Sequence, residues 1–114
     1  MRILVTGGSG FIGRNLVEHL SRDHEVLAPT HAELDLADPG ALDGWFSVHE
    51  VDVVVHGAVR PGNRNASDPS RQLWTNLRMF FGLMGNAQRF GRLVLLSSGA
   101  VYDIARPLDR IAEE

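Results

Sequence analysis

The 114-residue chain contains no cysteine and no lysine, and its single tyrosine is Tyr102. Without cysteine the chain has neither disulfide bonds nor thiolate metal sites. Its 11 basic residues are all arginine and are scattered, and the formal net charge is −3. This pattern does not indicate a nucleic-acid surface or a basic membrane-binding face. The five histidines lack the spacing of metal ligands, so we predict no metal site.

Long apolar runs are also missing from the sequence. No stretch approaches the length that spans a membrane, and the N-terminus has the character of a strand rather than of a signal peptide. We therefore expect a soluble, cytoplasmic protein. With 44% hydrophobic residues, the chain can bury a core. Its length fits one small domain, residues 1–114, and leaves no room for a second.

The first twenty residues, MRILVTGGSGFIGRNLVEHL, predict a buried strand, a glycine-rich turn and a helix. Gly10 and Gly13, together with Gly7 or Gly8, have the spacing of a dinucleotide-binding turn. Glycines there permit a tight turn, close approach of the backbone to a pyrophosphate and close packing of the helix on the strand. The N-terminus of the helix would then face the phosphates. An ordinary strand–helix turn without a ligand is the alternative interpretation.

Strand and helix patterns alternate through the rest of the chain. We predict strands at 24–28, 52–55 and 93–96, a short strand at 34–36, a helix that begins at 38–39, and a long helix over 69–90. This alternation predicts an α/β fold with a doubly wound parallel sheet and helices on both faces. We expect five strands in the order 3-2-1-4-5. Ligands of such sheets bind at the carboxyl ends of the strands, where residues 6–13, 29–36, 56–60 and 97–102 would converge.

Three of these segments carry a resemblance to a known family. TGGSGFIG at 6–13, HGAV at 56–59 and SSGAVY at 97–102 resemble motifs of the extended short-chain dehydrogenase/reductase family, the NAD-dependent epimerases, dehydratases and reductases of nucleotide sugars. The resemblance covers the whole chain but only the N-terminal part of the family's members. It implies a Rossmann-like fold, truncated relative to the family. It also implies hydride transfer between a nicotinamide and a carbon of a nucleotide-activated sugar in the full-length parent, although a non-sugar carbonyl substrate stays possible.

The resemblance assigns cofactor contacts by position. They are Gly7, Gly10, Phe11, Ile12, Gly13, Thr30, His31, Asp35, Leu36, Gly57, Ala58, Val59, Asn76 and Ser97. The cofactor would be NAD or NADP. Pro29, Thr30 and His31 stand where a carboxylate would bind the ribose 2′-hydroxyl of NAD. Because that acid is missing, and because His31 and Arg14 are nearby, NADP is slightly favoured. His56 is interpreted as a half-buried histidine with satisfied hydrogen bonds.

The catalytic set implied by the resemblance is incomplete. Ser98 matches the hydroxyl that binds the reacting oxygen of the substrate, but the Tyr-x-x-x-Lys pair of the family is absent from these 114 residues. Proton transfer needs a positioned group of that kind, so we expect these residues to bind the cofactor without catalysis on their own. The alternative is a stand-alone NAD(P)-binding module. We also expect a homo-oligomer, because the sheet edge after the last strand would be uncovered.

Overall fold

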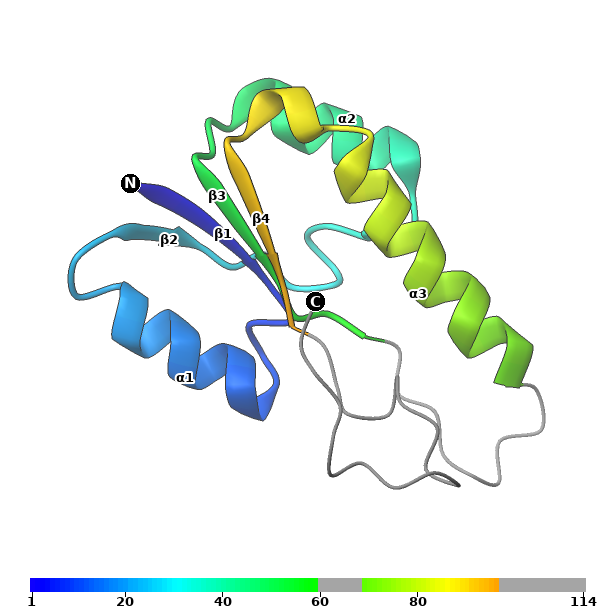
Figure 1. Cartoon of the computed structure of the whole chain (residues 1–114), viewed down its shortest axis with the longest axis horizontal. Coiled ribbons are helices and arrows are strands. Elements are labelled where there is room, and N and C mark those ends of the chain that lie inside the picture. The colour runs from blue at the N-terminus through cyan, green and yellow to red at the C-terminus, as the bar shows by residue number, and fades with distance from the viewer. Residues whose placement is uncertain (60–68, 97–114) are drawn as a thin grey trace, which may run out of the picture.

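The computed structural model describes residues 1–59 and 69–96. Four strands and three α-helices alternate along this part of the chain, and all the strand pairs are parallel. The elements are β1 (Arg2–Thr6), α1 (Phe11–Leu20), β2 (Glu25–Leu27), α2 (Pro39–Val48), β3 (Val53–His56), α3 (Pro69–Met84), a short 3₁₀ helix η1 (Ala87–Arg89) and β4 (Arg92–Leu95). The strand order is β2-β1-β3-β4. Figure 1 shows the strands fanning out between α1 and the two other helices.

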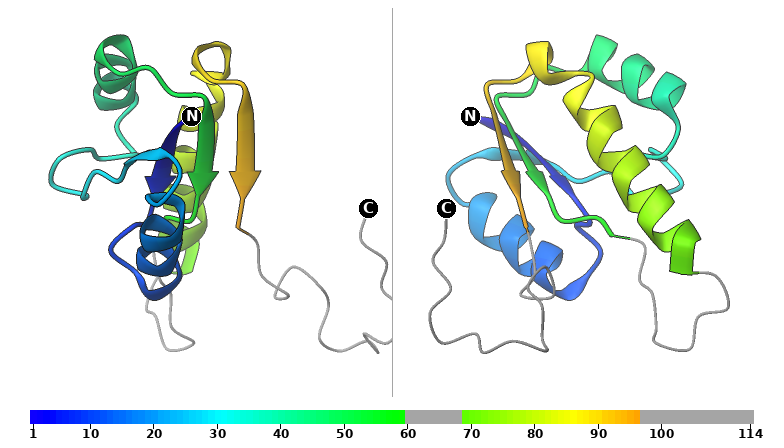
Figure 2. Two further views of the ribbon diagram at one scale, coloured as in Figure 1. Left: turned by 90° about the vertical axis from the view of Figure 1, so that its left-hand side faces the viewer. Right: turned by 45° about the vertical axis from the view of Figure 1, so that its right-hand side comes forward.

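The helices cover both faces of the sheet, as the alternation of side chains along each strand requires. On one face Ile3, Val5 and Val55 pack against the apolar side of α1. On the other face Leu4 and Val54 are fully buried in a larger cluster with α2 and α3. Figure 2 shows the same layers from two further directions. The predicted doubly wound parallel α/β sheet is therefore confirmed.

The predicted strand at 34–36 does not form. Leu34 and Leu36 are buried in the larger cluster, but the segment between them is a turn. The Asp35 carboxylate accepts a hydrogen bond from the Ala37 amide at 3.0 Å, and the Asp38 amide donates to the Asp35 carbonyl at 3.1 Å. Side chain and backbone thus satisfy the polar groups locally, as aspartate does in turns. The described sheet has four strands, and the predicted order 3-2-1-4-5 is correct apart from its outermost strand.

The helix predicted over 69–90 ends earlier, at Met84. Asn86 explains this end: its amide donates to the Leu83 carbonyl at 2.9 Å, and its side chain donates to the Gly82 carbonyl at 3.1 Å. Gly82 and Gly85 also weaken the last turn of the helix. Gly91, at the end of the predicted helix, does not cap it. Its amide donates to the Asp52 carbonyl at 2.8 Å, which aligns the chain for β4.

The start of α2 follows the sequence signal. Asp38 is the N-cap, and its carboxylate accepts hydrogen bonds from the Gly40 and Ala41 amides at 3.0 and 3.3 Å. Pro39 occupies the first turn, where its missing N–H has no helical partner to lose. Among the described residues, no helix is both long and apolar enough to cross a bilayer.

Candidate dinucleotide-binding site

A cavity of about 530 Å³ lies at the carboxyl ends of β1 and β3. Five segments of the described chain line it: the glycine turn, the end of β2, the turn before α2, the loop after β3, and α3. The lining residues are Thr6, Gly7, Gly8, Ser9, Gly10, Pro29, Thr30, His31, Leu34, Asp35, Leu36, Ala37, Gly57, Ala58, Val59, Thr75 and Met79. Its position is the one expected for the ligand of an open parallel sheet.

The structure brings nine of the predicted site residues together in this lining. They are Gly7, Gly10, Thr30, His31, Asp35, Leu36, Gly57, Ala58 and Val59. Phe11, Ile12, Gly13 and Asn76 are not in the lining. The Phe11 and Ile12 side chains are exposed at the start of α1, Gly13 is buried beneath the glycine turn, and Asn76 is half-buried on α3. Ser97 and the predicted catalytic Ser98 lie outside the described residues.

Three glycines of the turn serve three different purposes. Gly7 has a φ of +76°, and a Cβ atom there would lie 2.7 Å from the carbonyl of Gly57. A Cβ on Gly13 would overlap the carbonyl oxygen of Gly7. Gly10 is different, because its nearest neighbour would be the same carbonyl oxygen at 3.5 Å, an ordinary contact. Glycine at positions 7 and 13 is therefore required by the packing of the turn. At position 10 the lack of a side chain leaves the backbone uncovered at the cavity wall.

The N-terminus of α1 completes this wall. Gly10 is the N-cap of α1 and no side chain caps the helix. The first-turn amides of a helix lack intrahelical acceptors and carry the positive end of the helix dipole. Since Gly10 itself lines the cavity, the wall at α1 combines a bare backbone with a positive potential. These are the properties that accommodate a pyrophosphate.

Thr30 and Glu33 hold the turn at the end of β2. The Thr30 amide donates to the Glu33 carboxylate at 2.9 Å, and the Glu33 amide donates to the Thr30 hydroxyl at 3.3 Å. These two hydrogen bonds have the pattern of a helix capping box, here around a single turn. The bonds from Thr30 stabilise the charged form and lower the pKa of Glu33. The Glu33 carboxylate is thus engaged by the backbone instead of pointing to a ribose.

Thr6, which lines the cavity, forms a buried pair with His56. Their side chains are 2% and 4% exposed, and Thr6 Oγ1 lies 2.6 Å from His56 Nδ1. The Gly57 and Ala58 amides also donate to Thr6 Oγ1, each at 3.1 Å. Burial lowers the pKa of His56, so the neutral imidazole is favoured. The predicted satisfied histidine is confirmed, although it is buried rather than half-buried.

Eight of the seventeen lining residues are not among the predicted contacts, and Thr6, Thr75 and Met79 are three of them. Thr75 and Met79 reach the cavity from α3, and their spacing of four places them on one helix face. That spacing was a usable signal, but it is also the spacing of a core stripe. Thr6 is the last residue of β1, and its hydrogen bonds depend on residues fifty positions away. No local pattern in the sequence reveals them.

The sequence matches the model of the NAD dependent epimerase/dehydratase family over residues 3–114. The chain belongs to this family. It is 35% identical over 106 residues to a GDP-L-fucose synthase from Azorhizobium caulinodans, covering 89% of this chain and 34% of that protein. It is 30% identical over 107 residues to a GDP-L-colitose synthase from Yersinia pseudotuberculosis, covering 90% and 35%. The chain therefore spans about a third of the length of these curated relatives.

Solved structures of similar proteins agree with this family membership. The GDP-mannoheptose C4 reductase MlghC from Campylobacter jejuni, with NADP bound, superposes with a TM-score of 0.85 at 25% identity, over 95% of this chain and 36% of that one. Other relatives of this chain include a UDP-glucose 4-epimerase from Bacillus subtilis and a dTDP-glucose 4,6-dehydratase from Mycobacterium tuberculosis. The homologues are thus NAD(P)-using reductases, epimerases and dehydratases of nucleotide sugars.

Proposed function

We propose that these 114 residues are the NAD(P)-binding portion of an oxidoreductase, epimerase or dehydratase that acts on a nucleotide-activated sugar. The observation that carries this proposal is the cavity beside the glycine turn, whose wall at Gly10 is bare backbone with space for a ligand. Gly7 and Gly10 would hold the pyrophosphate against the N-terminus of α1. A nicotinamide bound there would supply or accept the hydride in such a reaction.

The remaining predicted contacts divide between the two ends of the cofactor. Thr30, His31, Asp35 and Leu36 would lie at the adenosine end, since they line the cavity beyond β2. Gly57, Ala58 and Val59 line the cavity after β3. We also retain Phe11, Ile12, Gly13, Asn76 and Ser97 as proposed contacts or supports of the cofactor, and Ser98 as the proposed group at the reacting oxygen.

NADP is the dinucleotide that the adenosine end favours. A carboxylate at the end of β2 would bind the ribose 2′-hydroxyl of NAD and repel a 2′-phosphate. The residues at this point are Pro29, Thr30 and His31, and the nearest carboxylate, Glu33, accepts a hydrogen bond from the Thr30 amide. The negative charge of Glu33 is therefore partly compensated by the Thr30 amide. The residues directly after β2 include no carboxylate.

Catalysis by these residues alone is not expected. The family chemistry uses a tyrosine and a lysine as a general acid/base pair, and the sequence contains no lysine. If the isolated chain instead acts as an NAD(P)-binding module, it will bind the dinucleotide with the same geometry. An assay that detects turnover of a nucleotide sugar by these 114 residues would contradict both interpretations.

Separate titrations with NADPH and NADH test the proposed function. We expect saturable binding of at least one dinucleotide, with higher affinity for NADPH. A Cβ on Gly10 would make only an ordinary contact at 3.5 Å, and Gly10 lines the cavity. Gly10→Val should therefore abolish binding, while valine as a poor N-cap should lower the free energy of unfolding by only about 1 kcal/mol. Gly44→Val is the matched control, because a Cβ at Gly44 on α2 meets nothing within 4 Å. Undiminished affinity in Gly10→Val would refute the assignment of the glycine turn.

A further inference from the structure

The hydroxyl of Thr6 has all of its hydrogen-bonding capacity in use. A hydroxyl offers one donor and two acceptor lone pairs. The Gly57 and Ala58 amides, each at 3.1 Å, can only donate, so they use the acceptor side of the hydroxyl oxygen. The Gly57 hydrogen is shared with the Thr6 carbonyl oxygen, also at 3.1 Å, whereas the Ala58 amide donates to the hydroxyl. The one hydroxyl hydrogen must then point to His56 Nδ1, which lies 2.6 Å away. Hydrogen-bond accounting therefore makes Nδ1 of His56 an acceptor and places the imidazole proton on Nε2.

This arrangement connects two parts of the cavity lining. Thr6 ends β1 and leads into the glycine turn, whereas Gly57 and Ala58 follow the neighbouring strand β3 and form the adjacent part of the lining. The two parts are in close contact, since a Cβ on Gly7 would lie 2.8 Å from the Ala58 amide nitrogen. Thr6 and His56 are themselves paired in register across β1 and β3. Rotation of the Thr6 hydroxyl would weaken the hydrogen bond from the Ala58 amide and shift the backbone there, whereas the Gly57 amide would keep the Thr6 carbonyl oxygen as an acceptor.

We propose that Thr6 and His56 are a positioning pair for the dinucleotide: His56 orients the Thr6 hydroxyl, and the hydroxyl oxygen fixes the Gly57–Ala58 wall of the cavity. The inference rests on the proposed function and deepens it, because neither residue was assigned a role in holding the cofactor. His56 acts through Thr6 and is separated from the ligand by it. The pair sets the width of the site by holding the backbone in place, and it does not itself supply binding contacts.

Protonation of His56 would break the arrangement. The imidazolium has a hydrogen on both nitrogens, so Thr6 Oγ1 would face three donors with two lone pairs. Its bonds to the amides would weaken, although the Gly57 amide would retain the Thr6 carbonyl oxygen as an acceptor. The described ionisable side chains on the elements packed around β3 are Arg2, Arg14, Glu18, His19, Asp43, Arg71, Arg78 and Arg92. Burial alone lowers the pKa of His56, with no contribution from these groups. The positioning pair is thus intact at neutral pH and is lost in acid.

Four variants separate this role from a general effect on folding. Thr6→Val removes the hydroxyl and keeps the shape, and His56→Leu removes the acceptor; we expect both to weaken dinucleotide binding about tenfold, the effect of losing roughly one hydrogen bond. Thr6→Ser and His56→Asn keep a hydroxyl and an acceptor, and their affinities should stay within about twofold of the original. Val55→Ala is the control for destabilisation, because Val55 packs on the opposite face against α1; it should lower the melting temperature without changing the affinity of the folded protein.

The pH profile of binding gives the readout that a merely structural role would not change. Affinity of the unmodified chain should fall as the pH is lowered through the pKa of His56, whereas His56→Asn should show no such fall. A Thr6→Val chain that is folded and binds with full affinity would overturn the proposal, as would a pH profile unchanged in His56→Asn.

Amide hydrogen exchange at Gly57 and Ala58 distinguishes failure of this inference from failure of the proposed function. In the chain without ligand, we expect the Ala58 amide to be protected with Thr or Ser at position 6 and unprotected with Val. The Gly57 amide should stay protected in all three proteins, because it also donates to the carbonyl oxygen of residue 6. If amide exchange follows the expected pattern but the unmodified chain binds neither NADPH nor NADH, the proposed function fails, and the positioning role fails with it. If the chain binds and Thr6→Val changes exchange but not affinity, only the positioning role is refuted.

Discussion

Gly7, Gly10 and Gly13 share one residue type, yet the structure requires glycine at only two of them. Gly7 needs its positive φ, and Gly13 needs the space that a Cβ would take from the Gly7 carbonyl. A Cβ on Gly10 would make only an ordinary contact with the Gly7 carbonyl oxygen, at 3.5 Å. Because Gly10 also lines the cavity, the proposed ligand accounts for glycine at this position where close packing does not.

His56 makes the stability of the fold dependent on pH. Its pKa in the folded chain is lowered by burial from an ordinary value of 6.5. As the pH falls below that value, the unfolded chain gains its proton before folded His56 does, so the free energy of unfolding decreases. This decrease should continue until the pH reaches the lowered pKa and then level off.

Urea denaturation at a series of pH values measures this effect. We expect the midpoint to fall from about pH 7.5 to about pH 5.5. In His56→Asn the part of the fall that belongs to this side chain should disappear, whereas Thr6→Ser should retain it. An equal fall in the unmodified chain and in His56→Asn would show that His56 is not the group responsible.

At the scale of the secondary-structure elements, the start of α2 offers a direct test of a sequence signal. Asp38 accepts hydrogen bonds from the Gly40 and Ala41 amides, two of the donors that a helix N-terminus leaves unpaired. Asp38→Ala should lower the free energy of unfolding by about 1 kcal/mol. Asp38→Asn is the matched control and should cost much less, since asparagine is also a good N-cap. Chemical denaturation of the unmodified chain and the two variants measures these differences. Equal losses of unfolding free energy in both variants would contradict the capping role.

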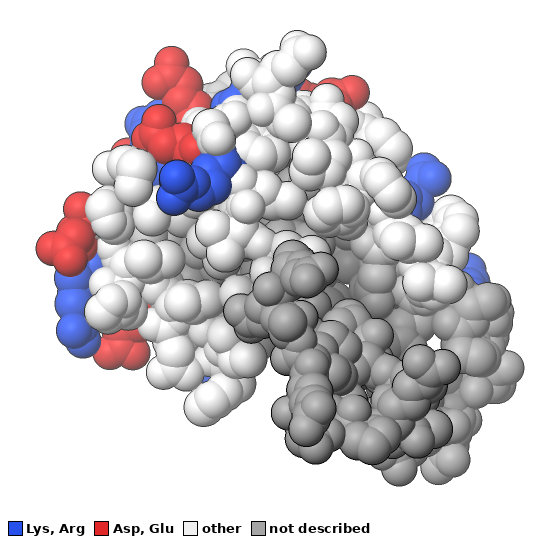
Figure 3. Space-filling model, viewed as in Figure 1, with Lys and Arg blue, Asp and Glu red and all other residues white. Residues whose placement is uncertain are grey.

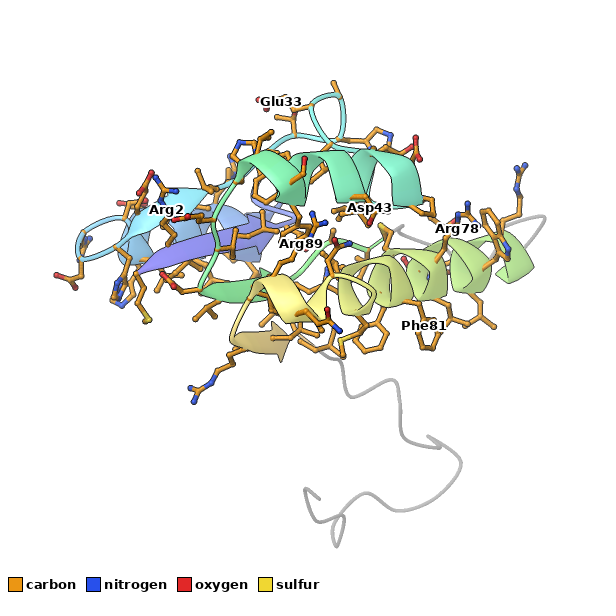
Figure 4. All side chains as sticks on the ribbon, turned by 90° about the horizontal axis from the view of Figure 1, so that it is seen from above. Arg2, Glu33, Asp43, Arg78, Phe81 and Arg89 are labelled. Carbon is orange, nitrogen blue, oxygen red and sulfur yellow. The ribbon has the colours of Figure 1, made fainter. Side chains whose placement is uncertain are left out.

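The α2–α3 pair shows which contacts hold these elements together. Asn86 is 5% exposed and donates to Asp43 on α2 at 3.2 Å, and Arg89 donates to the Asp43 carbonyl at 3.1 Å. Figure 4 shows Asp43 and Arg89 between the two helices, with Phe81 on the far side of α3. A Cβ on Gly82 would lie 2.6 Å from Leu42 Cδ1. Gly82 of α3 thus permits a close approach to α2.

Sequence patterns were sufficient for elements whose signals are local. The β-branched run at 53–55 and the Asp38-Pro39 pair gave β3 and the start of α2 within one residue. The segment at 34–36 was misjudged because two buried leucines flanking an aspartate look the same in a strand and in a turn. The Asp35–Ala37 hydrogen bond that decides between them depends on the conformation of the backbone. The site followed the same division, since the glycine turn was predictable and the Thr6–His56 pair was not.

At the scale of the whole molecule, α3 and β4 each expose several apolar side chains. On α3, Leu73, Leu77 and Phe81 are 62%, 45% and 63% exposed, and on β4 Val94 and Leu95 are 40% and 52% exposed. The face in Figure 3 has its charged side chains near the periphery and a broad uncharged area between them. Exposed apolar patches of this kind mark contacts with other protein surfaces. The chain spans about a third of its curated relatives, so the rest of a longer protein and a second copy are both possible occupants.

We predict that these 114 residues self-associate through the β4 edge rather than through the exposed side of α3. In the described part of the chain, β4 pairs only with β3, and an unpaired edge presents free backbone groups to another strand. We expect sedimentation to show an oligomer. Val94→Lys places a charge on that edge, a substitution that opposes edge pairing, and should give monomer. Phe81→Lys is the matched variant on α3 and should leave the oligomer intact if the edge is the interface. The reverse result would assign the contact to α3, and monomer in the unmodified chain would rule out self-association.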